Sequence, residues 1–181
     1  MPRIPPVNPE TATAEQKALW RETAAAHGDV TNMKATLLHS RVALRAVLEW
    51  YDLFDEARKF LSEREAILFC SAISRANHCQ ICSLFMRRAI VKWGEKDPEH
   101  PVLDNRAQAL VDFGRQLAVD AHNVSDALFA RLKAHFDDVQ IVNLTAFGGL
   151  MIVNNLFNDA LKVDLDASLE PYKVSPEVLF G

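Results

Sequence analysis

Glycine and proline are scarce in this sequence, and their scarcity argues against a β-protein. The 181 residues include only six glycines and eight prolines. The prolines lie near the N-terminus, at 98 and 101, and at 171 and 176, so the segments 10–97 and 102–170 contain none. A β-protein of this length needs many tight turns, which usually take glycine or proline. The proline-free segments are also rich in residues that favour helices, so the sequence predicts an all-α protein.

An excess of positive charge and a long apolar run are also missing. The net charge of −4 and a pI near 5.9 give no electrostatic basis for binding nucleic acid. The longest apolar run, 146–153, is far shorter than a membrane span. We therefore expect no nucleic acid and no membrane as a partner.

Secretion signals and a disulfide framework are not apparent either. The chain does not open on a basic segment followed by an apolar one, and it has only three cysteines. We therefore expect a cytoplasmic, reducing location. The composition is that of an ordinary globular protein, at 49% hydrophobic and 24% charged residues.

Helix caps and breaks predict a single domain over 1–181, folded as a bundle of about seven to eight helices. Thr13 and Ser62 each begin a capping box, which marks a helix start. We expect 95–101 to be a polar connection, and 1–10 and 162–181 to be extended arms. The predicted helices span 13–28, 33–39, 41–60, 62–76, 79–94, 104–121, 125–136 and 138–161.

The chemical signal is Cys79-Gln80-Ile81-Cys82 at the start of a predicted helix. Cysteines at this spacing in a helix are close enough to form a disulfide. The positive end of the helix dipole favours a thiolate and so predicts a lowered cysteine pKa. A thiolate with a second thiol in reach suits redox chemistry. Three arginines close in sequence add to this effect if they point inward: Arg75, Arg87 and Arg88.

Simpler interpretations of these cysteines stay open. A zinc site needs four ligands, and only Cys70 and His78 lie nearby in sequence. Both cysteines of the pair also suit a buried core, as does Cys70 in its apolar helix. The Arg87-Arg88 pair is typical of a solvated face. An apolar stripe follows on the same helix and predicts core or a subunit interface, with a pocket wall as the alternative: Cys79, Cys82, Met86, Ala89, Ile90 and Trp93.

The segments 28–33, 39–40, 61–65, 74–82 and 144–161, in that order, resemble the carboxymuconolactone decarboxylase superfamily. The likeness is to its alkylhydroperoxidase D-like, peroxidase-related branch, and it covers nearly the whole chain. The resemblance implies an all-α fold, a trimer or hexamer, and a cofactor-free thiol peroxidase. It implies that Cys82 attacks the hydroperoxide and that Cys79 resolves the product and exchanges with an external thiol reductant. An apolar wall beside the thiols also suits a lipoyl-type reductant.

The sequence departs from this pattern at both positions of its proton relay. The relay glutamate and histidine of the family correspond here to Ile67 and Met86, and neither side chain carries a proton. His78, next to Cys79, is one candidate substitute, although it also suits an ordinary helix-flanking position. Glu65 is a second candidate, although its place in the capping box and its angle from Ile67 around the helix favour a structural role.

Three functions follow from these patterns. The first is a dithiol peroxidase or disulfide oxidoreductase. The second is a helical oligomer whose catalytic site has decayed and that serves as a binding or scaffold protein. The third is the acid–base lactone chemistry of the superfamily's other branch, which the cysteine pair disfavours.

Overall fold

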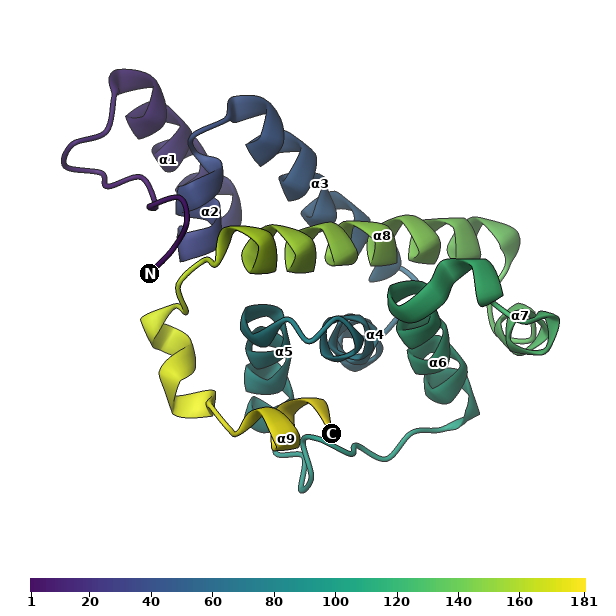
Figure 1. The fold of residues 1–181 in the computed structure, drawn as a ribbon. Helices are drawn as coiled ribbons and strands as arrows, with labels where there is room; N and C mark the ends of the chain where they lie inside the picture. The colour runs from purple at the N-terminus through teal and green to yellow at the C-terminus, as the bar shows by residue number, and fades with distance from the viewer.

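The computed structural model describes residues 1–181 and confirms the predicted all-α fold (Figure 1). Each of the eight predicted helices is present, and short helices follow them near the C-terminus. There are no strands. The α-helices are α1 (Ala14–His27), α2 (Asn32–Leu37), α3 (Arg41–Ala57), α4 (Glu63–Ala76), α5 (Gln80–Lys92), α6 (Asn105–Asp120), α7 (Asp126–Lys133), α8 (Asp138–Leu161) and α9 (Pro176–Phe180). Two 3-10 helices, η1 (Ala121–Asn123) and η2 (Ala167–Tyr172), complete the chain.

Side-chain caps fix where the helices begin. The two predicted capping boxes, at Thr13 and Ser62, are formed, and Asp137 forms a third at the start of α8. In each box the cap side chain accepts a hydrogen bond from the third backbone N–H, and the third side chain accepts one in return. These bonds satisfy N–H groups that a helix start leaves unpaired.

The core surrounds α4, which packs against α5, α6 and α8 (Figure 1). Phe69 and Ile73 of α4 have no exposed surface. Two glycines allow the neighbouring helices to approach Phe69: a Cβ at Gly114 would lie 2.8 Å from its ring, and one at Gly148 would lie 3.1 Å from it. These close contacts hold α6 and α8 against α4, the helix that precedes the cysteine pair.

The segment 162–181 is folded, which corrects the predicted extended arm. It forms η2 and α9, which pack against α5 and α4 respectively. Leu169 and Leu179 are buried in a small cluster with Ile81 and Leu84 of α5. Burial of these apolar side chains explains why the segment does not stay extended.

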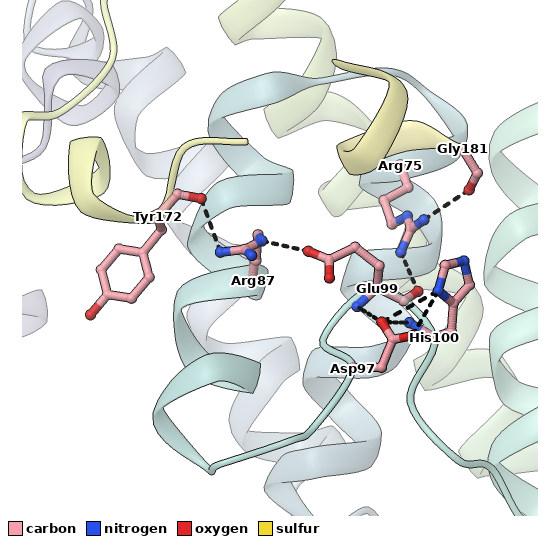
Figure 2. A network of polar contacts seen from close by, with 7 residues as sticks. All are labelled: Arg75, Arg87, Asp97, Glu99, His100, Tyr172 and Gly181. Carbon is pink, nitrogen blue, oxygen red and sulfur yellow. Dashed lines mark hydrogen bonds and ion pairs between the residues drawn. The ribbon is translucent and has the colours of Figure 1, made fainter. Parts of the chain in front are cut away.

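A polar network ties this segment and the 95–101 connection to the bundle (Figure 2). Arg87 donates to the Glu99 carboxylate over 2.6 Å and to the Tyr172 carbonyl over 3.1 Å. Arg75 donates to the carbonyls of Glu99 and Gly181, over 2.6 and 3.0 Å. The prediction that Arg87 is solvated is therefore wrong, since its ion pair with Glu99 is largely buried.

Arg88 stacks over Phe85 and donates to the Ser168 hydroxyl over 3.2 Å. None of the three arginines, Arg75, Arg87 and Arg88, pairs with a cysteine sulfur. The prediction that they lower the cysteine pKa is therefore wrong, since none of them contributes to the shift of the Cys82 pKa.

By length and composition alone, α8 is apolar enough to cross a membrane, with a mean hydropathy of 1.3 over its most apolar window. Core helices of globular proteins have the same property. Here α8 packs against α3, α4, α5, α6 and α7, and its side chains Leu144, Phe147 and Met151 are buried. Packing of one side of α8 against the bundle accounts for part of its hydropathy, and exposed apolar residues on its other side account for the rest.

Candidate functional site

A sharp turn between α4 and α5 places the two cysteines. His78 has a left-handed backbone (φ 55°), which L-residues other than glycine adopt rarely. The turn closes with the Cys79 N–H donating to the Ser74 carbonyl over 3.0 Å. Cys79 is then the N-cap of α5, and Cys82 lies in its first turn. Both are free thiols, and the Cys82 thiol lies within hydrogen-bonding reach of Cys79.

Cys82 borders an apolar cavity of about 150 Å³, which we call the inner cavity. Cys79 does not line it and has no exposed surface. The inner cavity adjoins a wider, more open one of about 730 Å³, the outer cavity, with which it shares six lining residues. Cys82 is thus the sulfur that a small molecule entering through these cavities would meet. The walls of the inner cavity include Met33, Val47, Leu48, Trp50, Ile81, Phe85, Met86 and Met151.

Two residues at the C-terminal end of α8 complete the site. The Asn158 carboxamide donates to the Cys82 sulfur over 3.2 Å and is buried. The Asp159 carboxylate lies close enough to the Cys79 thiol for the thiol to act on its pKa. Asp159 is exposed, so its carboxylate can also exchange protons with water. Cys79 therefore has Cys82 as one neighbour and Asp159 as another.

The sequence analysis missed both of these residues. Both residues belong to the segment 144–161, which carries part of the family resemblance and could have directed attention to them. No sequence spacing relates this segment to the cysteine pair, however, and only the packing of α8 against α5 brings them together.

The pKa of Cys82 is raised well above its usual value, which corrects the prediction of a lowered pKa. The hydrogen bond to Cys79 is the largest cause, and burial adds to it. The bond from Asn158 acts in the opposite direction, because it stabilises the thiolate. Burial also raises the pKa of Asp159, against the hydrogen bond from the Cys79 thiol, which lowers it. Asp159 is thereby suited to accept a proton closer to neutral pH than an exposed aspartate is.

The two predicted substitutes for the relay are held elsewhere. Glu65 keeps its place in the capping box with Ser62 and pairs with Arg106. His78 is exposed, and its ring lies 5.2 Å from that of Phe180. Neither side chain has a hydrogen bond to a cysteine, because the turn that positions Cys79 directs His78 towards α9.

Ile67 and Met86 both line the outer cavity. The positions that the resemblance assigns to a proton relay therefore do lie beside the path to Cys82, but they provide an apolar surface there. Asp159 approaches the pair from another side, through Cys79.

The structure provides no set of ligands for a zinc ion. No group of three or more His, Cys, Asp or Glu side chains is placed to hold a metal ion. Cys70 is fully buried in the main hydrophobic cluster, where burial raises its pKa strongly. It is a core residue, as the sequence predicts.

Comparison with known proteins identifies the fold. No protein-family model matches the sequence, and no curated protein matches it. Among solved structures, a peroxidase-related protein with an alkylhydroperoxidase AhpD core, from Ralstonia eutropha JMP134, is similar with a TM-score of 0.76 at 20% identity. The match covers 93% of this chain and 94% of that one.

Two further structures show the same likeness. A peroxidase-related protein from Silicibacter sp. TM1040 matches with a TM-score of 0.69 at 20% identity, over 95% of this chain and 93% of that one. The debrominase Bmp8 matches with a TM-score of 0.74 at 13% identity, over 97% of each chain. The chain therefore has the AhpD-like fold, and the resemblance predicted from the sequence is confirmed at the level of the fold.

Proposed function

We propose that the protein is a dithiol peroxidase that reduces organic hydroperoxides with Cys82 and Cys79. The observation that carries the proposal is the arrangement of Asp159, Cys79 and Cys82, the last of which borders the inner cavity. It supplies the three requirements of such an enzyme: a nucleophilic sulfur facing a substrate cavity, a second thiol in reach, and a proton acceptor. A decayed site would have no reason to keep all three together.

The groups that shift the pKa values of Cys82 and Asp159 suggest a path for the proton of Cys82. Cys79 is the neighbour that raises the pKa of Cys82 most, and the Cys79 thiol acts to lower the pKa of Asp159, so we infer that the proton passes from Cys82 to Cys79 and from Cys79 to Asp159. When Asp159 takes the proton of Cys79, Cys79 can take that of Cys82, which leaves a Cys82 thiolate. The Asn158 amide stabilises this thiolate.

The thiolate then attacks the terminal oxygen of the hydroperoxide. A bond forms between sulfur and oxygen, the O–O bond breaks, and the alkoxide leaves and takes up a proton to become an alcohol. Cys79 next attacks the sulfur of the resulting sulfenic acid, and its proton leaves with the hydroxyl as water. The two thiols have then supplied two electrons, and the cysteines are joined as a disulfide.

An external thiol reductant must reduce this disulfide. The resemblance assigns that exchange to Cys79, but Cys79 is fully buried and only Cys82 borders the cavity. We therefore propose that the reductant attacks Cys82 and that Asp159 protonates Cys79 as it leaves. A slender dithiol such as a lipoyl group suits the apolar path. A cytoplasmic location fits this cycle, because thiol reductants are kept reduced there.

A titration of the reduced protein tests the proposal. One equivalent of tert-butyl hydroperoxide is expected to be consumed per chain, with two of the three thiols lost and a disulfide between Cys79 and Cys82 found by peptide mass spectrometry. Retention of all three thiols would overturn the peroxidase and favour the scaffold alternative. Turnover of a muconolactone by a Cys79→Ala, Cys82→Ala double variant would favour the lactone chemistry instead.

We also propose that the protein is a homo-oligomer, and that α8 provides a contact between copies. Its outward side carries apolar residues at alternating spacings of three and four, the repeat of a coiled-coil seam. No charged residue lies between Asp138 and Asp159 to oppose contact with a second copy. We call this set the α8 stripe: Val139, Val142, Ala146, Gly149, Val153, Leu156 and Ala160.

A charge within the α8 stripe is expected to dissociate the oligomer. Val142 and Val153 are 66% and 42% exposed, so Val142→Glu with Val153→Glu leaves the monomer core intact but opposes burial in an interface. Light scattering is expected to show a multiple of 20.3 kDa for the wild type and a single chain for the variant. Val102→Glu, at an 86% exposed position outside α8, is the control. A monomeric wild type, or a variant of unchanged mass, would contradict the proposal.

A further inference from the structure

The inner cavity contains polar atoms that have no partner. Trp50 Nε1, Asn154 Oδ1 and Asn158 Oδ1 are buried without a hydrogen bond, and all three residues line this cavity. Buried polar groups in native proteins are nearly always paired, because leaving them unpaired is unfavourable. Three such atoms around one apolar cavity indicate that their partner is a ligand.

The positions of these atoms are fixed by packing. The Trp50 ring packs against Phe54 and Phe147, at 5.1 and 5.4 Å between ring centroids, which restricts the direction of its N–H. Asn154 and Asn158 lie one turn apart on α8 and are 7% and 2% exposed. Asn158 uses its amide nitrogen on the Cys82 sulfur, so its unpaired oxygen lies beside that sulfur. One donor and two acceptors without partners therefore belong to residues that line the same cavity as Cys82.

We propose that Trp50 and Asn154 determine specificity, and that with Asn158 they bind a compact alkyl hydroperoxide. The inference rests on the proposed peroxidase and names the residues that would bind the hydroperoxide and limit its size. The terminal O–H of the hydroperoxide donates to a carboxamide oxygen, which directs the terminal oxygen to Cys82. The Trp50 N–H donates to the oxygen next to carbon, which becomes the alkoxide when the O–O bond breaks. The alkyl group fills the apolar part of the cavity.

The size of the inner cavity limits the substrate. A volume of about 150 Å³ accommodates an alkyl or aryl group the size of benzene. The tert-butyl group meets this limit, and a longer chain would have to extend into the outer cavity. tert-Butyl hydroperoxide is therefore the probe for the test.

The test is to remove each polar group. Asn154→Leu removes the carboxamide at nearly constant volume, and Trp50→Phe removes the indole N–H together with one ring. Each is expected to lower kcat/KM for tert-butyl hydroperoxide about tenfold or more. Asn154→Leu is also expected to keep or raise Tm, since it removes an unpaired buried group, whereas loss of a merely structural residue would lower Tm. Trp50→Phe is expected to lower Tm, because the smaller ring leaves a cavity in the core. Trp93→Phe, at the partly exposed end of α5, is the matched control and should match the wild type.

The possible results separate this inference from the proposed function. If the wild type consumes the peroxide and both variants match it, Trp50 and Asn154 do not bind substrate, although the peroxidase stands. If the wild type consumes none, the peroxidase itself fails and this inference fails with it. If activity and Tm fall together in Asn154→Leu, Asn154 is structural and the inference is overturned.

Discussion

Replacement of Cys82 by serine is expected to reduce peroxide consumption by on the order of 10³-fold or more, to the background rate. A serine hydroxyl at this position borders the inner cavity as Cys82 does, but it is a far weaker nucleophile than a thiolate. The measurement is the rate at which tert-butyl hydroperoxide disappears in the presence of excess dithiol. A Cys82→Ser variant that consumes peroxide at the wild-type rate would end the proposal that this sulfur reacts.

Replacement of Cys79 by serine is expected to have a different result. In the absence of a reductant Cys82 can still attack, but no second thiol of the chain resolves the sulfenic acid, so each chain consumes one equivalent and keeps Cys82 as a sulfenic acid. A sulfenic-acid trap should then label Cys82. Cys70→Ala is the control, because Cys70 lies in the core and should not affect turnover. Absence of the sulfenic-acid label on Cys82 in Cys79→Ser, or loss of activity in Cys70→Ala, would show that the thiol roles are assigned wrongly.

Local signals in the sequence were sufficient to predict most of the fold. Thr13 and Ser62 form the capping boxes that their spacing predicts, and the eight predicted helices are present. The exception is 162–181, where two prolines indicated an extended arm. What folds this segment is burial of Leu169 and Leu179 against α5 and the bonds from Arg75 and Arg87, and both depend on tertiary contacts.

The sequence predicts the two cysteines of the candidate site but not the residues of α8 beside them. Cys79 and Cys82 are visible because their spacing carries the chemistry. Asp159 is not, since its relation to Cys79 depends on how α8 crosses α5. The sign of the Cys82 pKa shift also depends on packing: the helix start favours a thiolate, but the neighbouring thiol and burial outweigh it.

Glu65 and His78 show that closeness in the sequence is a poor guide to which residue replaces a missing proton relay. Both lie near the cysteines in the chain, but Arg106 and the capping box hold Glu65, and α9 lies against His78. The proton acceptor that the structure offers instead comes from the far end of the chain.

Replacement of Asp159 by asparagine is expected to slow disulfide formation about 10²–10⁴-fold at neutral pH. Asparagine has nearly the same shape and can still accept a hydrogen bond from Cys79, but it cannot accept the proton. Cys82 then stays a thiol, because its pKa is raised. The measurement is the rate of thiol loss after mixing with peroxide. Asp164→Asn, an exposed change of the same charge on the same segment, should behave as the wild type.

The pH profile distinguishes a proton acceptor from a merely structural aspartate. Asp159 must be ionised to accept a proton, so the wild-type rate should fall as pH is lowered through its raised pKa. Asp159→Asn should lack this acidic limb and should gain rate only at alkaline pH, where Cys82 ionises without help. Because a raised carboxyl pKa means that ionised Asp159 opposes folding as pH rises, the variant should also unfold no more easily than the wild type at neutral pH. An unchanged acidic limb in Asp159→Asn would mean that another group takes the proton, and the path through Cys79 would have to be abandoned.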